Sequence, residues 1–222
     1  MKRSIIQTRD GSTTIHIEGW DECYHSRFGA IQEAQHVFIK NGLSLFENKS
    51  ISILEIGFGT GLNAFITFLE SQKLNQKIDY VGVEAYPVSA EEVVSMNYTS
   101  ELNAEKDSEI FKKIHKCNWE EQIILRDNFL FTKRLQFFED IIDLEKFDLI
   151  YFDAFGFDAQ PELWSTPIFK KMYNALKSNG VLVTYAARGV VKRSMIEVGF
   201  KVEKLEGPPG KREMFRAKKG CY

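Results

Sequence analysis

The sequence is poor in cysteine and has no long apolar run. Its 222 residues include three cysteines, Cys23, Cys117 and Cys221, which are scattered and odd in number. This pattern argues against a disulfide framework or a zinc site and fits a reducing, cytoplasmic setting. No apolar run approaches the ~20 residues of a membrane span. The N-terminus, MKRSIIQTRDG, lacks the apolar core of a signal peptide. We therefore expect a cytoplasmic protein that binds neither a membrane nor a metal.

The composition is that of an ordinary globular domain, but the charge is unevenly distributed. The chain is 44% hydrophobic and 27% charged, with a net charge of −2. Residues 188–222 carry ten Lys/Arg and four Asp/Glu, a charge of +6, and the preceding residues carry −8. A basic C-terminal segment is typical of a nucleic-acid surface, although a solvated face has the same composition.

Short apolar runs alternate with longer helical stretches. We predict strands at residues 51–56, 79–84, 134–138, 147–152, 180–185, 199–204 and 212–217. We predict helices at residues 61–73, 88–97, 107–124, 161–177 and 189–198. This alternation indicates βαβ units in a mostly parallel sheet. Only residues 206–211 separate the last two strands, which should therefore form an antiparallel hairpin. This arrangement resembles the Rossmann-like α/β fold of the class I methyltransferases.

The first 50 residues do not follow this alternation. The segment TRDGSTTIHI predicts a hairpin that turns at Asp10 and Gly11. Residues 26–40 predict a helix that ends at Asn41 and Gly42. We expect residues 1–50 to form a small cap on the sheet, within the same domain as the core at 51–222.

The segment ILEIGFGTGLNAF, residues 53–65, predicts a strand, a glycine turn and a helix. Its glycines let backbone N–H groups approach a ligand whose polar end lies at the start of the helix. A dinucleotide fingerprint is G-x-G-x-x-G, and Leu62 stands where its last glycine would be. The turn therefore favours a nucleotide-like ligand without a pyrophosphate, although such a turn also serves structure alone.

Three acidic side chains sharpen this interpretation. Glu55 lies in an otherwise apolar strand, where a carboxylate is costly unless it is paired, and we expect it to contact a ligand amino group. Glu84 ends the second strand, where an acid accepts ribose hydroxyls. Asp140, or its neighbour Glu139, follows the third strand and could accept from an adenine amino group. An ammonium, a ribose and an adenine without a phosphate match S-adenosyl-L-methionine.

The fourth predicted strand leads into YFDAFGFDAQPELWS, residues 151–165. Asp153 falls at the carboxyl end of a central strand, where open α/β sheets place their chemistry. A carboxylate beside aromatic rings suits a substrate that carries an amine on a planar base. Phe155 and Trp164 could stack on that base or anchor the core, and Pro161 should begin a helix.

The chain resembles the methyltransferase half of the bifunctional MnmC family, which makes 5-methylaminomethyl-2-thiouridine in tRNA. The matching blocks run nearly from end to end: residues 21–26, 29–30, 33–38, 55–63, 152–155, 161–164, 184–189, 191–193 and 207–214. Ala154 stands where that family usually has glycine. The resemblance implies a cofactor loop made of Glu55, Gly57, Phe58, Gly59, Gly61 and Asn63. The family's flavin-dependent oxidoreductase half has no counterpart before Tyr222, so we expect a methyltransferase that acts alone.

The implied reaction is N-methylation of the 5-aminomethyl group of the wobble uridine in the tRNA anticodon loop. Asp153 would orient the amine and accept its proton, with Tyr24 as a second candidate, while Phe155 bounds the base. The cations expected to meet tRNA phosphates are Arg188, Lys192, Arg193, Lys211 and Arg212. We expect a monomer. Two alternatives stay open: an aminopropyltransferase of the spermidine synthase type, and a non-catalytic RNA-binding protein that retains the fold.

Overall fold

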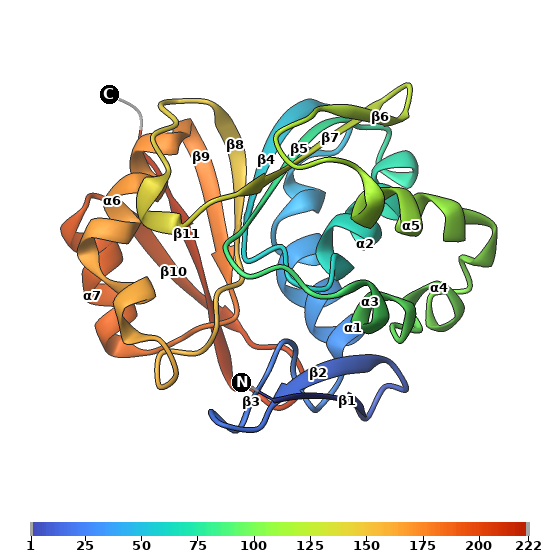
Figure 1. Ribbon diagram of the computed structural model, residues 1–222. Helices are drawn as coiled ribbons and strands as arrows, with labels where there is room; N and C mark the ends of the chain where they lie inside the picture. Colours follow the sequence, from blue (N-terminus) through green and yellow to red (C-terminus); the bar gives the residue numbers. More distant parts are fainter. Residues whose placement is uncertain (1, 221–222) are drawn as a thin grey trace.

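The computed structural model describes residues 2–220, and an eight-stranded sheet lies at its centre (Figure 1). The strands are β4 Ser50–Ile56, β5 Lys77–Glu84, β6 Ile123–Arg126, β7 Phe129–Leu135, β8 Phe147–Phe152, β9 Leu176–Thr184, β10 Lys201–Glu206 and β11 Glu213–Lys218. Their order is β10-β11-β9-β8-β4-β5-β7-β6. The strands from β9 to β7 are parallel, whereas β11 is antiparallel to β9 and β10 and β6 is antiparallel to β7. The predicted parallel sheet with a late antiparallel hairpin is confirmed.

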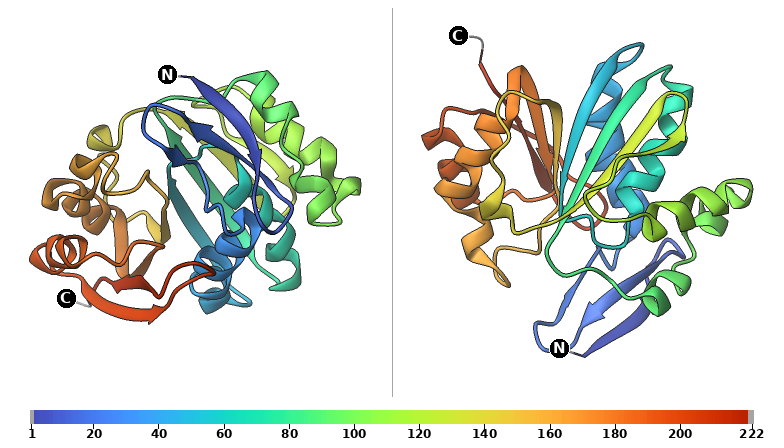
Figure 2. Two further views of the ribbon diagram at one scale, coloured as in Figure 1. Left: turned by 90° about the horizontal axis from the view of Figure 1, so that it is seen from below. Right: turned by 45° about the horizontal axis from the view of Figure 1, so that its top comes forward.

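Helices cover both faces of this sheet (Figures 1 and 2). One face is covered by α1 Ala30–Ala34, the π-helix η1 Gln35–Lys40, α2 Leu62–Lys73 and α5 Ser108–Lys116. The other is covered by α6 Thr166–Ala175 and α7 Gly189–Glu197. Ile53 and Leu54 point to opposite faces of β4 and neither is exposed, as expected for a central parallel strand. The remaining short elements are η2 Leu43–Phe46, α3 Ala90–Val94, α4 Tyr98–Glu101, η3 Glu105–Asp107, η4 Phe138–Asp140 and η5 Pro161–Trp164.

The N-terminal residues form a separate three-stranded sheet of β1 Arg3–Gln7, β2 Thr13–Ile17 and β3 Glu22–Cys23. The β1–β2 turn contains Gly11 at φ 89°, and the Asp10 carboxylate accepts from the Ser12 amide at 3.1 Å. The hairpin predicted at this turn is therefore confirmed. Figure 2 shows this sheet lying across one edge of the central sheet.

Several predicted boundaries are wrong, each for a local reason. The helix expected at 107–124 ends at Lys116, because the backbone turns at Glu120 with φ 64° and then enters β6. The strand expected at 134–138 is β7, which begins at Phe129. The helix expected at 88–97 is only α3. The helix expected at 161–177 is the short turn η5 followed by α6, and β9 already begins at Leu176.

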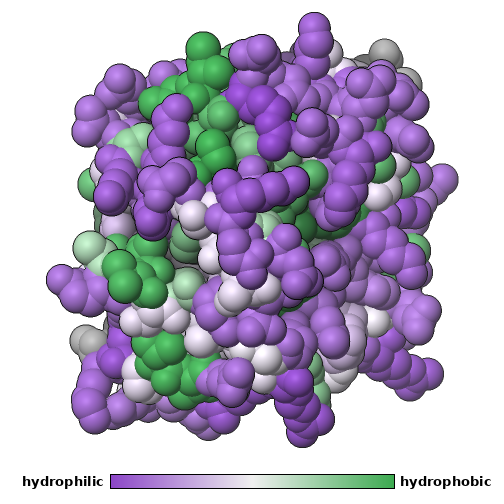
Figure 3. All heavy atoms as spheres, turned by 90° about the vertical axis from the view of Figure 1, so that its right-hand side faces the viewer, coloured by the Kyte–Doolittle hydropathy of each residue, from purple (hydrophilic) through white to green (hydrophobic). Residues whose placement is uncertain are grey.

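Within the described residues, no helix is long and apolar enough to cross a membrane. Figure 3 shows that the face over α4, α5 and β6 is mainly hydrophilic, with small, separate apolar patches. Cys23 and Cys117 are free thiols, and Cys221 lies outside the described residues.

Candidate active site

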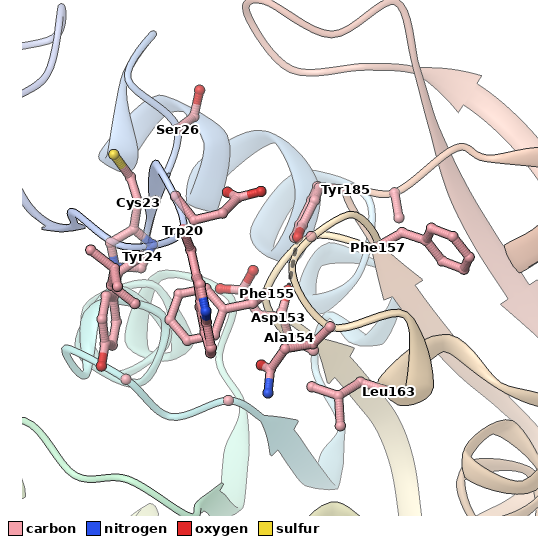
Figure 4. A pocket seen from close by; sticks show the side chains of 18 of the residues that line it. Trp20, Cys23, Tyr24, Ser26, Asp153, Ala154, Phe155, Phe157, Leu163 and Tyr185 are labelled. Atoms are coloured by element: carbon pink, nitrogen blue, oxygen red, sulfur yellow. Dashed lines mark hydrogen bonds between the residues drawn. The ribbon is translucent and has the colours of Figure 1, made fainter. Parts of the chain in front are cut away.

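A cavity of about 1530 Å³ opens between the N-terminal sheet and the carboxyl ends of β4, β5 and β8. The glycine turn after β4 and the loop after β8 line its inner walls. The start of α7 and the β10–β11 turn close another side. Figure 4 shows residues of the N-terminal sheet facing those of the β8 loop across this space. The cavity therefore lies where open α/β sheets bind their ligands.

The glycine turn presents Gly57 and Gly59 to the cavity. Both have positive φ, 86° and 49°. A Cβ on Gly57 would lie 2.5 Å from the backbone oxygen of Asp153, and one on Gly59 would lie 3.1 Å from the Tyr24 ring. Glycine is therefore required at these two positions for packing as well as for conformation.

Two other members of the predicted cofactor loop point away from the cavity. Phe58 is 4% exposed and packs in the core against His115 and Phe131. Gly61 caps the start of α2 at φ 73°. Neither residue lines the cavity, and their contact with the ligand stays a prediction.

A buried polar cluster that sequence reasoning missed supports the turn at Thr60. The Thr60 hydroxyl lies 2.7 Å from His25 Nε2 and accepts from the Tyr98 hydroxyl at 3.0 Å. His115 Nε2 lies 3.1 Å from the Thr60 carbonyl oxygen. Burial lowers the pKa of His25 and of His115 to about 4, so both rings are neutral. A neutral His25 can accept from Thr60, which ties the N-terminal sheet to the glycine turn.

Glu84 stands at the cavity wall, held by three backbone amides. Its Oε2 accepts from Gly59 N at 2.9 Å, and Oε1 accepts from Ala85 N at 3.0 Å and Tyr86 N at 2.9 Å. These bonds fix the carboxylate at the end of β5 before any ligand arrives. The aromatic rings of Tyr86 and Phe137 lie beside it on the same wall and meet edge to face, with centroids 5.9 Å apart.

The structure corrects the prediction for the acid after the third parallel strand. Glu139 lines the cavity, whereas Asp140 is exposed outside it. The turn η4 rotates consecutive side chains to different sides, so only one of the two neighbours can face the ligand.

Asp153 lies on the cavity floor directly after β8. Asn63 Nδ2 donates to Asp153 Oδ2 at 2.8 Å. Burial raises the pKa of Asp153 to about 7; the nearby Glu33 carboxylate raises it further, while Asn63 and Lys211 favour the charged form. A carboxyl group with this pKa can take up a proton at neutral pH. Asn63 itself is 2% exposed and acts through Asp153 rather than from the cavity wall.

Glu55 is completely buried and does not line the cavity. Neither of its oxygens has a hydrogen-bond partner, and burial raises its pKa well above the usual range. Direct contact with a ligand amino group, as predicted, is therefore contradicted by its position.

Aromatic rings form the wall opposite the glycine turn. The Phe155 ring meets the Tyr24 ring edge to face, with centroids 5.0 Å apart, and the Trp20 ring at 5.7 Å (Figure 4). Trp20 is 37% exposed and was missed, because nothing in its local sequence marks it as part of a site. Burial raises the pKa of Tyr24, so its hydroxyl is protonated at neutral pH, and its role beside Asp153 stays a prediction.

Trp164 is a core residue and not a cavity residue. It has no exposed surface, and its Nε1 donates to the Phe155 carbonyl oxygen at 2.8 Å. The Tyr185 hydroxyl similarly donates to the Ala154 carbonyl oxygen at 2.7 Å. Of the two roles expected for Trp164, stacking on a base and anchoring the core, its burial favours the second, and it anchors the loop that carries Phe155.

The five predicted tRNA-contacting cations lie in different environments. Arg188, Lys211 and Arg212 line the cavity, while Lys192 and Arg193 lie outside it on α7. Arg188 pairs with Asp158, and Lys211 pairs with the buried carboxylate of Glu33.

Lys211 also lies over the Tyr185 ring, 3.7 Å from its centroid. These contacts assign Lys211 to the interior of the site, so its predicted role at tRNA phosphates is not supported.

The donor set of the cavity fits S-adenosyl-L-methionine. Two glycines leave room for close backbone approach, a carboxylate is held at the end of β5, and aromatic rings flank it. Among residues 2–220, no three His, Cys, Asp or Glu side chains gather into a metal site.

The fold and the site together define a class I S-adenosylmethionine-dependent methyltransferase. The chain belongs to a family of S-adenosyl-L-methionine-dependent methyltransferases, whose profile matches residues 105–220. The chain is thus an enzyme, and S-adenosyl-L-methionine is its cofactor.

Curated relatives share one name. The tRNA 5-methylaminomethyl-2-thiouridine biosynthesis bifunctional protein MnmC of Burkholderia multivorans is 28% identical over 95% of this chain and 34% of its own length. Its namesake in Leptospira borgpetersenii is 29% identical over 91% of this chain and 33% of its own length. The chain thus spans about one third of the curated relatives that it matches.

Solved structures share the fold. A crystal structure of MNMC2 from Aquifex aeolicus superposes with a TM-score of 0.77 at 22% identity, covering 97% of this chain and 70% of that one. Spermidine synthase from Thermotoga maritima gives a TM-score of 0.59 at 14% identity, over 98% and 68%. At these identities the likeness concerns the fold alone.

Proposed function

We propose that this enzyme methylates the primary amine of 5-aminomethyl-2-thiouridine at the wobble position of tRNA. Support comes from the relatives named for 5-methylaminomethyl-2-thiouridine biosynthesis, which align over nearly the whole of this chain. The observation that carries the proposal is Asp153, a carboxyl group with a pKa of about 7 on the floor of an aromatic-walled cavity.

The cofactor would be held by the backbone of Gly57 and Gly59, the Glu84 carboxylate, and the wall that includes Tyr86 and Glu139. When bound, S-adenosyl-L-methionine supplies an electrophilic methyl group. The protein contributes chiefly by holding the uncharged amine in line with that group, which replaces a random encounter by a fixed geometry.

Asp153 would then manage the proton. Because Asn63 occupies Oδ2, the atom open to the substrate is Oδ1. The amine forms hydrogen bonds to this oxygen, and the proton that nitrogen must lose passes to it and then to solvent. The pKa of about 7 lets Asp153 accept a proton near neutral pH and release it in the same range.

The uridine would lie against Phe155 and Trp20, whose rings meet edge to face at the cavity. A wobble base lies in a loop and can be splayed out to enter such a site. Arg212 at the rim and Lys192 and Arg193 on α7 would meet phosphates. This substrate implies a cytoplasmic enzyme, and we propose that it acts as a monomer.

The test is transfer of a labelled methyl group to tRNA from cells that cannot complete this modification. Nucleoside mass spectrometry should show 5-aminomethyl uridines gaining one methyl group. Asp153→Asn, which keeps the side-chain shape, is the matched control and should give no product. Intact cofactor binding without label in any tRNA pool would refute the proposal.

An aminopropyltransferase is the second candidate, because many acidic side chains line the cavity, among them Glu22, Glu33, Asp153 and Asp158. Glu33 is paired with a lysine and Asp158 with an arginine, so two of these four carboxylates already have a cationic partner. Incubation with decarboxylated S-adenosylmethionine and putrescine distinguishes the two reactions, and we expect no spermidine.

A further inference from the structure

Four buried polar atoms without hydrogen-bond partners lie beneath the floor of the cavity. They are both carboxyl oxygens of Glu55, the hydroxyl oxygen of Tyr80 and Oδ1 of Asn63. Tyr80 and Asn63 are the side chains placed to hydrogen-bond with Glu55, so the four atoms form one group. More than about 90% of buried polar groups in proteins are paired, and a cluster of exceptions therefore needs a physical explanation.

A single proton satisfies all four atoms. An ionised Glu55 can only accept, and Asn63 has already committed its Nδ2 to Asp153 at 2.8 Å. The amide oxygen of Asn63 would then face a carboxylate with no hydrogen between them. A protonated Glu55 can donate to Asn63 Oδ1 with one oxygen and accept from the Tyr80 hydroxyl with the other. The result is a continuous chain from Tyr80 through Glu55 and Asn63 to Asp153.

The same proton could instead reside on Asp153, if the oxygen and nitrogen of the Asn63 amide exchanged places. The exposure of the two carboxyl groups to solvent distinguishes these arrangements. Glu55 has no exposed surface, whereas Asp153 is partly exposed and lines the cavity. Charge is therefore more costly on Glu55, and the proton should reside there.

The groups around Glu55 also favour its protonated form. It faces Tyr80 and Glu84 from β5, Tyr151 from β8, Asn63 from α2, and Asp153. None of these groups is a cation, and the Tyr151 hydroxyl is paired with Thr67 at 3.3 Å. Burial raises the pKa of Glu55 well above its ordinary value; the Asp153 and Glu84 carboxylates add to this effect, while the Tyr80 and Asn63 side chains oppose it.

We propose that Glu55 holds a proton in the free enzyme and donates it to Asn63 Oδ1, and so aims the Asp153 carboxylate at the cavity. Glu55 is then a positioning residue that acts through Asn63. Its value for catalysis rests on the proposed role of Asp153, but its protonation does not depend on which substrate is methylated.

The direct test is carbon-13 NMR of the side-chain carboxyl groups in the cofactor-free protein, with Glu55→Gln used to assign the signal. We expect the Glu55 carboxyl to stay protonated throughout the pH range in which Asp153 titrates. A Glu55 carboxyl that titrates in the ordinary range, near 4.5, would overturn the proposal.

Variants provide a second test through the titration midpoint of Asp153. Glu55→Gln is neutral and keeps one donor and one acceptor, so the midpoint should move by less than about 0.3 pH units. If Glu55 were ionised, removing its charge would lower that midpoint by about one unit or more, which contradicts the proposal.

Asn63→Leu should raise the same midpoint by about one unit, because it removes the donor to Asp153. An unchanged midpoint in this variant would contradict the proposed row of hydrogen bonds from Tyr80 to Asp153. Should the leucine variant not fold, Glu55→Gln still decides. All these readouts are made without tRNA, so they remain valid if the proposed substrate is wrong.

Discussion

Replacing Asp153 by asparagine should abolish methyl transfer and stabilise the free protein, increasingly as the pH rises. A carboxyl group whose pKa is higher in the folded state destabilises the fold when it ionises. The cost is absent well below the ordinary pKa of 3.8 and complete above the folded value of about 7. Asparagine keeps the shape and a hydrogen bond to Asn63 but cannot ionise.

The magnitude follows from the two pKa values. One pKa unit corresponds to about 1.4 kcal/mol, so the cost of ionising Asp153 is about 4 kcal/mol at pH 8 and about 2 kcal/mol at pH 5. The stability advantage of Asp153→Asn should therefore grow by about 2–3 kcal/mol between these pH values. For a chain of this length that difference corresponds to roughly 5–10 °C in melting temperature.

The assay is thermal or urea unfolding of both proteins at pH 5 and pH 8. Asp158→Asn is the matched control in the same loop, since Asp158 is exposed and paired with Arg188, and its loss should matter by less than about 1 kcal/mol at either pH. A gap between wild type and Asp153→Asn that stays constant from pH 5 to pH 8 would refute the raised pKa, and with it the case for Asp153 as proton acceptor.

Three further predictions concern the cavity and the loops that build it. Gly59→Ala, whose Cβ would lie 3.1 Å from the Tyr24 ring at a φ of 49°, should weaken cofactor binding by about tenfold or more in calorimetry while the fold persists. Trp164→Phe removes the hydrogen bond to the Phe155 carbonyl and should lower the free energy of unfolding by about 1–3 kcal/mol in urea denaturation. Arg212→Ala should weaken tRNA binding and reduce the magnitude of its salt slope by about one, measured by filter binding at several salt concentrations.

The secondary structure could be predicted where the spacing of apolar residues fitted only a helix or only a strand. The run FDLIYF is apolar enough to identify β8 at residues 147–152, and the short link before Glu213 excluded a crossover helix. The prediction of helix ends failed where apolar residues continued at the same spacing beyond the end of a helix. Ile123 and Ile124 continue the apolar spacing of α5. The helix nevertheless ends at Lys116, and the left-handed backbone at Glu120 leads into β6.

The candidate site was predictable where residues follow parallel strands. Gly57, Glu84 and Asp153 each end a strand or directly follow one, and the sheet brings these ends to one edge. The sequence could not assign Trp20 or Lys211, because each reaches the cavity from a hairpin outside the parallel core. Their contacts depend on tertiary packing that no local pattern records.

Glu55 shows how a correct physical premise can lead to the wrong partner. A carboxylate on an apolar strand must be compensated, and from the sequence a bound amino group was the evident compensation. In the structure no cation reaches it, so the less costly solution is to keep the proton and donate it to a neighbour. Because Asn63 also binds Asp153, the proposed arrangement keeps Glu55 neutral and leaves Asp153, which lines the cavity, free to titrate. In the proposed reaction Asp153 accepts the proton of the amine, and Glu55 holds Asp153 in place through Asn63.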